Sequence, residues 1–275
     1  MPNDPVLESI SADLAAGRTE GLTTKVLAAA ESYSDPFDML KCLSFLKLLP
    51  QDGTESKLAN MILDRTDSGN GLEVAKALYN LGLSYFALKA LKDVEPSDHT
   101  YRLTCRCQYD MEEYESAMDT YSLIKEPVVN DRILLSSIQS SVGEHAKSIE
   151  TASALLNDFP DDYDVRIAYV NALMMGGRTK DVSKYIRDGV KDKSADSYAV
   201  AAYVLRIQGN IKAAGGYASR AVTLNNEHIG AMETLGICLA LKNEYVKAKI
   251  VAGAINELSP GDKAAISVLS YCEGH

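Results

Sequence analysis

The sequence predicts an all-α protein, a right-handed α-α superhelix of about eight helix pairs followed by a C-terminal capping helix. Two observations support this prediction. Small residues, turn residues and apolar stretches recur with a period near 34 residues, and Gly and Pro fall mainly between the apolar stretches. A fixed period of this size is typical of helical repeat arrays, in which each helix pair buries its apolar face against the next pair.

The clearest repeat extends from Glu227 to Asp262. Ala248 lies twelve residues after Gly236, and Pro260 lies twelve residues after Ala248. Two amphipathic helices joined by a turn at 242–244 explain these spacings. Small residues allow the two helices to cross closely, and Pro cannot continue the second helix.

The same pattern recurs one period earlier along the chain. Ala202 replaces Gly236, Gly209 marks the turn, and Ala214 and Ala218 line the second helix. This pattern resembles the tetratricopeptide repeat, a helix-turn-helix unit with large, small and Pro residues at set places. The resemblance covers the small-residue positions and the turns.

The usual Trp of the tetratricopeptide family is absent throughout, and residues such as Met232 and Tyr198 take its place. Six repeats phased in this way cover residues 68 to 262. Their predicted turns are Gly82, the Glu112-Glu113 corner, Gly143, Gly177, Gly209 and Asn243.

The first 67 residues predict two divergent helix pairs. The helices of the first pair are Pro5–Ala16 and Leu22–Ser32, broken at Gly17, and those of the second are Phe37–Leu49 and Thr54–Asp64, broken at 50–53. Residues 263–275 are expected to form the capping helix and a tail. Because no Pro/Gly/Ser-rich linker interrupts the series, we expect residues 1–275 to form one elongated solenoid domain.

Composition narrows the class of protein. A net charge of −10 disfavours a general nucleic-acid binder, which needs a basic face to displace counterions from phosphates. No apolar run is long enough for a membrane span, and the N-terminus lacks the pattern of a signal peptide. Five scattered cysteines do not form a disulfide framework. We therefore expect a cytoplasmic protein without membrane insertion.

Motifs that carry catalysis are not found in the sequence. The four histidines are widely separated, and no phosphate-binding loop or nucleophile elbow is present. Acidic pairs such as Glu112-Glu113 lie at turns or helix starts, and Gly176-Gly177 and Gly215-Gly216 are interpreted as breaks between helices. We expect no enzymatic activity, no cofactor and no bound metal.

The tetratricopeptide resemblance implies that the first helices of successive repeats line a concave groove. Such a groove takes an extended peptide or a helix of a partner protein. Candidate groove residues are those on first helices that packing does not require. They are Lys76, Tyr79, Asn80, Arg102, Arg106, Tyr109, Ile133, Ser137, Asn171, Met174, Tyr203 and Arg206.

Arg102 and Arg106 are four residues apart and share one helical face. They either bind a partner or pair with an acidic residue of a neighbouring helix. Some tetratricopeptide proteins grip a peptide carboxyl terminus with five Lys, Asn and Arg side chains. The whole set does not occur in any three successive repeats, so that function is not transferred.

The sequence favours a non-catalytic scaffold or adaptor whose partner is another protein. Two alternatives remain. One, by analogy with the family, is a chaperone or accessory subunit of a secretion, pilus or polysaccharide system. The other is a subunit that positions a substrate for a separate enzyme. Self-association is also open, because the irregular first 67 residues could be a cap or a homo-oligomer interface.

Overall fold

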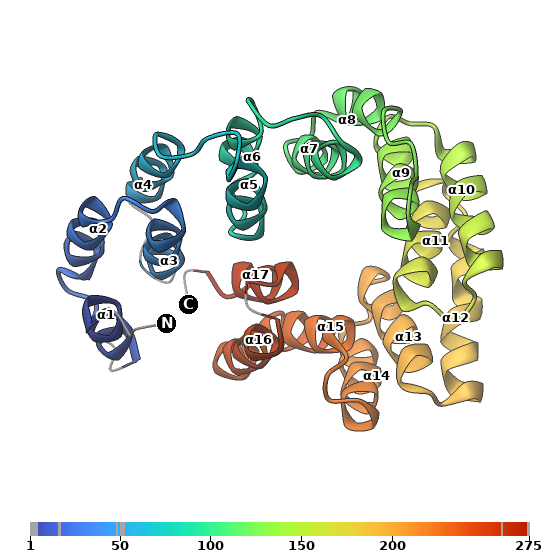
Figure 1. The fold of residues 1–275 in the computed structure, drawn as a ribbon. Helices are drawn as coiled ribbons and strands as arrows, with labels where there is room; N and C mark the ends of the chain where they lie inside the picture. Colours follow the sequence, from blue (N-terminus) through green and yellow to red (C-terminus); the bar gives the residue numbers. More distant parts are fainter. Residues whose placement is uncertain (1–4, 16–17, 48, 50–52, 260, 274–275) are drawn as a thin grey trace. The chain divides into compact units, whose positions relative to one another are not determined.

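The computed structural model describes residues 5–15, 18–47, 49, 53–259 and 261–273. These residues form seventeen helices and no strand (Figure 1). Sixteen of the helices follow one another as eight pairs, and the last stands alone at the C-terminal end. The predicted all-α class, the eight pairs and the final helix are therefore confirmed.

Contacts divide the chain into two compact units, residues 1–125 and residues 126–275. The predicted single domain over 1–275 stays a prediction. The helices of the first unit are α1 (Pro5–Ala15), α2 (Leu22–Ser32), α3 (Pro36–Leu46), α4 (Thr54–Leu63), α5 (Gly71–Asn80), α6 (Ser84–Ala90), α7 (Asp98–Asp110) and α8 (Tyr114–Tyr121).

The second unit contains the longer second helices and the final single helix. Its helices are α9 (Val129–Ser141), α10 (His145–Asp158), α11 (Tyr163–Met175), α12 (Thr179–Asp192), α13 (Ala195–Ile207), α14 (Ile211–Leu224), α15 (Ile229–Ala240), α16 (Tyr245–Leu258) and α17 (Lys263–Ser270).

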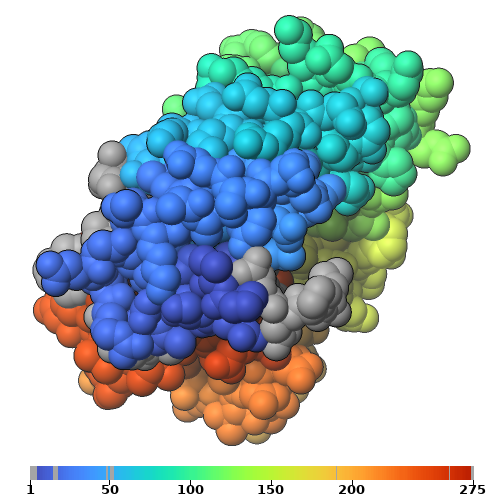
Figure 2. Space-filling view, turned by 60° about the vertical axis from the view of Figure 1, so that its left-hand side comes forward, coloured from blue at the N-terminus to red at the C-terminus, as the bar shows by residue number. Residues whose placement is uncertain are grey.

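Within each unit, helices contact their neighbours in chain order, except that α4 packs against α6 more than against α5. In the second unit the first helices also contact one another in the series α9, α11, α13, α15 and α17. The first unit repeats this arrangement with α1, α3, α5 and α7. Its successive segments, coloured blue to cyan, form adjacent bands on the surface in Figure 2. First helices thus lie side by side within each unit, as a repeat array requires.

The six predicted turns share one backbone geometry. Each contains a residue in the left-handed region: Gly82 (φ 75°), Glu112 (φ 63°), Gly143 (φ 83°), Gly177 (φ 74°), Gly209 (φ 80°) and Asn243 (φ 62°). The next residue then donates its N–H to a carbonyl of the preceding helix, for example Glu144 to Gln139 at 2.8 Å. This is the Schellman ending, which satisfies carbonyls that a helix end leaves open. The predicted turns are confirmed.

Small residues lie where paired helices cross. Ala117, Ala214 and Ala248 are fully buried, as the repeat phasing predicts. In the α9–α10 pair, serines take the same role. The Ser136 and Ser148 hydroxyls lie 3.0 Å apart in the buried crossing, and each also donates to the carbonyl of the other residue. All five cysteines are buried, and none of them forms a disulfide bond with another described residue.

Some helix limits differ from those predicted. Helix α3 begins at Pro36 because the Asp35 side chain accepts from the Phe37 N–H, and it ends at Leu46. Helices α6 and α8 end well before Pro96 and Pro127. The predicted break at Gly17, residues 50–52 and the repeat end at Pro260 lie outside the described residues.

The interpretation of Gly215-Gly216 as a helix break is wrong, because both residues lie inside α14. Gly215 is buried, and a Cβ there would lie 3.5 Å from Cys238 Cβ. None of the described helices is both long and apolar enough to cross a membrane.

Candidate functional site

Three predicted groove residues of the second unit come together on adjacent first helices. The Tyr203 hydroxyl of α13 donates to Asn171 Oδ1 of α11 at 2.6 Å. One helical turn further along α13, the Arg206 guanidinium lies 5.1 Å from the centre of the Tyr203 ring. Together with Glu233 of α15, described below, we call these residues the first-helix cluster.

The positively charged guanidinium of Arg206 has no ion-pair partner among the described residues. Its Nε is buried and has no hydrogen-bond partner among them. The Tyr203 ring supports the guanidinium by a cation–π contact instead. An arginine held on an aromatic ring with donors left over is suited to bind a carboxylate.

Glu233 adds a half-buried carboxyl group to the cluster. Burial raises its pKa, and a hydrogen bond from Ser267 of α17 and the charge of Arg206 partly offset this rise. The side chain therefore links α15 to the final helix and lies within electrostatic reach of Arg206. Its negative charge keeps the cluster from being purely basic.

Tyr163 borders the cluster at the start of α11. Its ring meets His228 edge-on, with 4.7 Å between the ring centres. A Cβ at Gly230 would lie 2.4 Å from Tyr163 Cε1, so only glycine fits there. Burial is the main cause that raises the pKa of the Tyr163 hydroxyl, with Glu233 adding to it, so the hydroxyl stays protonated.

His228 fixes the start of α15 beside Tyr163. Its Nδ1 accepts the N–H of Ala231 at 3.2 Å, and its Nε2 lies 3.2 Å from Asp196 Oδ1. Because Nδ1 accepts a hydrogen bond, Nε2 carries the proton that points to Asp196. This contact ties α15 to α13.

The other predicted groove residues of the second unit have local roles. Met174 is half-buried and packs against the apolar cluster of Leu173 and Val204. The Ser137 hydroxyl donates to the carbonyl of Ile133 on its own helix at 3.3 Å. Ile133 and Ser137 form no hydrogen bond with the first-helix cluster among the described residues, and their role in binding stays a prediction.

In the first unit the predicted residues lie on α5 and α7. Lys76 is exposed and forms an ion pair with Glu73 at 2.7 Å, while Asn80 is exposed. Tyr79 is half-buried and packs against the apolar core of this unit.

On α7, Arg102 lies 3.8 Å from Asp98 of the same helix, and Arg106 also has interactions within the structure. The ring of Tyr109 lies 5.5 Å from that of Tyr114. Asp98 thus lies on the same helix as Arg102, four residues away, and the role of both arginines in binding stays a prediction.

Sequence reasoning missed Tyr163, His228 and Glu233. Glu233 was visible as a carboxyl between Met232 and Thr234, which are both buried. A charged residue beside buried positions on a predicted first helix is the signal that could have identified it. The contact of Tyr163 with α15 had no comparable signal, because it depends on close approach at Gly230.

Metal binding finds no support in the geometry of the described residues. Within these ranges, no group of three His, Cys, Asp or Glu side chains is placed to hold a metal ion. The first-helix cluster combines a guanidinium, one phenol, an amide and a carboxyl group, which suits recognition of polar side chains.

These features define the class of protein: a helical repeat protein with the tetratricopeptide fold, with consecutive helix pairs, close crossings at small residues and Schellman turns. No protein-family model matches the sequence, and no curated protein matches it. The helix pairs and the turns between them confirm, for the fold, the resemblance seen in the sequence.

Solved structures of tetratricopeptide proteins are similar to this chain. One from Parabacteroides merdae is 13% identical and has a TM-score of 0.48, with 85% of this chain and 97% of that chain covered. YrrB, a tetratricopeptide protein with an unusual peptide-binding site, is 13% identical with a TM-score of 0.34, covering 77% and 97%. MamA from Desulfovibrio magneticus is 13% identical with a TM-score of 0.32, covering 58% and 94%.

Proposed function

We propose that this protein is a non-catalytic interaction scaffold that binds a peptide or helix of a partner protein. The first-helix cluster of the second unit is the proposed contact surface. One observation carries the proposal: Arg206 lies on a first helix, rests on the Tyr203 ring and has no ion-pair partner among the described residues.

The chemistry of the cluster favours an acidic group on the partner. A guanidinium binds a carboxylate through parallel N–H donors, and arginine and tyrosine are enriched among residues that dominate binding energy. The Asn171–Tyr203 hydrogen bond fixes the ring on which Arg206 rests. The arginine is therefore held in place before the partner arrives, which lowers the entropic cost of binding.

The predicted residues of the first unit are proposed as a contact region of their own. Lys76, Tyr79 and Asn80, with Arg102, Arg106 and Tyr109, would form a second contact region on the first unit. The acidic character of the chain fits a cytoplasmic protein–protein partner better than nucleic acid.

Affinity purification from the native organism identifies the partner, and the purified pair then allows a quantitative test. Arg206→Ala is expected to weaken partner binding about tenfold or more, because a central charged anchor is lost. Arg220→Ala is the matched control. Arg220 also lies over tyrosine rings, those of Tyr198 and Tyr217, but it belongs to the second helix α14.

The double variant Arg102→Glu and Arg106→Glu tests the first unit in the same assay. Circular dichroism and thermal unfolding verify that each variant is folded. Unchanged affinity for both Arg206→Ala and the double variant would show that the first helices do not bind the partner. Equal weakening by Arg206→Ala and Arg220→Ala would also contradict the proposal.

A further inference from the structure

A pocket of about 580 Å³ lies in the second unit and shares no residue with the first-helix cluster. Its walls come from the end of α10, the loop before α11, and helices α11, α12 and α13. This volume lies within the range of small-molecule and peptide side-chain pockets. The residues that line it include both charged groups and the apolar side chains of Leu156 and Val200.

Tyr185 of α12 is one of the residues that line the pocket. The residue is only 8% exposed, and its hydroxyl has no hydrogen-bond partner among the described residues. Burial raises the pKa of Tyr185 to about 12, so the hydroxyl remains a donor at neutral pH. A buried hydroxyl without a partner is costly and indicates an acceptor supplied from elsewhere.

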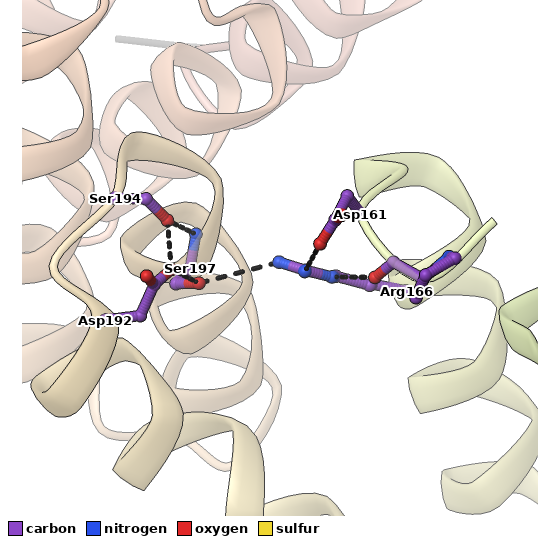
Figure 3. Close-up of polar contacts among 6 residues, drawn as sticks. Asp161, Arg166, Asp192, Ser194 and Ser197 are labelled. Carbon is purple, nitrogen blue, oxygen red and sulfur yellow. Dashed lines mark hydrogen bonds and ion pairs between the residues drawn. The ribbon is translucent and has the colours of Figure 1, made fainter.

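Arg166 of α11 also lines the pocket, and its charge acts on the Tyr185 hydroxyl. Its Nε donates to the Pro160 carbonyl at 2.7 Å and its Nη2 to Asp161 Oδ1 at 2.9 Å. Figure 3 shows the guanidinium extending from α11 toward Ser197 of α13. Its Nη1 reaches the Ser197 hydroxyl only at 3.5 Å, so this nitrogen keeps donor capacity.

Among the described residues, the Asp192 carboxylate forms no hydrogen bond or ion pair with the Arg166 guanidinium. This carboxylate accepts from the hydroxyls of Ser194 and Ser197, and these hydrogen bonds lower its pKa (Figure 3). On the same helix, Lys184 lies over the Tyr185 ring at 5.0 Å, and Lys191 also lines the pocket. Neither lysine forms an ion pair with any described carboxylate. The Tyr185 hydroxyl and the two lysines therefore keep donor capacity that no hydrogen bond or ion pair among the described residues uses.

We propose that this pocket binds a carboxylate attached to an apolar group. The Tyr185 hydroxyl and Arg166 Nη1 donate to the carboxylate, while Leu156 and Val200 contact the apolar group. Either a small carboxylic acid or the free C-terminus of a peptide with an apolar last residue has this chemistry.

Three aspartates at the pocket set the charge of the ligand. Asp161, Asp188 and Asp192 all line it and disfavour a second negative charge. A monoanionic carboxylate is therefore preferred over phosphate, whose average negative charge at neutral pH exceeds one. This selectivity separates the proposal from nonspecific attraction of anions to lysines.

Isothermal titration calorimetry of the full chain tests the proposal with three probes. N-acetyl-leucine carries the carboxylate, N-acetyl-leucinamide lacks it, and inorganic phosphate carries the larger charge. N-acetyl-leucine is expected to bind at least about tenfold more tightly than either of the others, because only it gives the donors a monoanionic acceptor. Equal affinity for the amide, or tighter binding of phosphate, overturns the proposal.

A second comparison distinguishes the two sources of the carboxylate. A tetrapeptide ending in Leu with a free carboxyl group binds about tenfold more tightly than N-acetyl-leucine if the pocket takes peptide termini. Affinities within about twofold of each other assign the pocket to small acids. If neither compound binds, the proposal is overturned.

Tyr185→Phe removes the hydroxyl and keeps the ring, and Tyr217→Phe is the matched control on α14. The first variant is expected to weaken N-acetyl-leucine binding about tenfold, and the control to leave it unchanged. Without ligand, Tyr185→Phe keeps or raises the midpoint of thermal unfolding, because it deletes an unpartnered buried hydroxyl. Undiminished binding by Tyr185→Phe overturns the proposal. Arg206→Ala is expected to leave this affinity unchanged, which separates this site from the first-helix cluster.

Discussion

At the scale of single residues, Glu233 has the least favourable surroundings in the first-helix cluster. Its carboxyl group is half-buried, and burial is the largest cause that raises its pKa. Ser267 supplies a hydrogen bond, but Arg206 forms no ion pair with it. The ionised form of Glu233 is therefore stabilised less in the folded protein than it is in water.

This arrangement predicts a pH dependence of stability. A carboxyl group with a raised pKa in the folded state binds its proton more tightly there than in the unfolded chain. The free energy of unfolding therefore falls as the pH rises above about the ordinary value of 4.5 and through the raised pKa. Glu233→Gln is expected to remove this fall and to be more stable than the wild type at neutral pH.

Urea unfolding between pH 4 and pH 8 measures the difference. Glu257→Gln, an exposed position on α16, is the control and should leave the slope unchanged. A Glu233→Gln variant that is less stable than the wild type at neutral pH would contradict the prediction. It would mean that Arg206 stabilises the anion more than burial destabilises it.

The sequence predicted part of the first-helix cluster. Asn171, Tyr203 and Arg206 follow from helical phase alone, because positions on adjacent first helices meet at fixed places in a repeat. Tyr163 and Glu233 do not follow from phase. Tyr163 reaches α15 only because Gly230 lacks a side chain, and the environment of Glu233 depends on Ser267 of a different helix.

At the scale of elements, the turns between paired helices are the most regular feature. Four of the six contain glycine in the left-handed region, and the other two contain Glu112 and Asn243 there. The left-handed region costs a residue with a Cβ about 1–2 kcal/mol. The two exceptions therefore keep the same turn against their own backbone preference.

These turns predict opposite effects for a pair of substitutions. Gly143→Ala should lower the free energy of unfolding by about 1 kcal/mol, because its φ of 83° strains any side chain while a Cβ there meets nothing within 4 Å. Glu112→Gly should raise it by about 0.5 kcal/mol, since relief of backbone strain exceeds the added entropy of the unfolded chain.

Urea unfolding of both variants checks this prediction. Gly216→Ala is a control in α14, because its φ is not left-handed and a Cβ meets nothing within 4 Å. Alanine should be stabilising at this helical position by about 0.5–1 kcal/mol. If Gly143→Ala and Gly216→Ala change stability in the same direction, backbone strain is not what the turns share.

Sequence patterns located helices better than they located helix ends. The sequence predicts that prolines end the second helices, and this holds for α10, where Pro160 follows closely. Helix α6 ends earlier because the chain after it packs over the start of α5. The carbonyl of Ala90 and the side chain of Val94 lie so close to Gly71 that a Cβ would be 2.7 and 2.5 Å away. Contacts of this kind have no period in the sequence.

At the scale of the whole molecule, each helix depends mainly on its neighbours in chain order. Buried apolar residues form several clusters, one within residues 10–107 and others confined to the second unit. In such an array, stability is the sum of repeat stabilities and nearest-neighbour interfaces. Loss of one buried side chain should therefore act locally and not on the entire chain.

Leu173→Ala tests this expectation because Leu173 is fully buried in the cluster of α11, α12 and α13. Its loss should destabilise these helices by about 2–5 kcal/mol. Hydrogen exchange followed by mass spectrometry should show faster exchange in residues 163–207 and unchanged exchange in residues 18–47. Met39→Ala, at a fully buried position of α3, should give the reverse pattern. An equal increase in both regions for either variant would instead support one cooperative domain over residues 1–275, because local openings would then have no lower free energy than global unfolding.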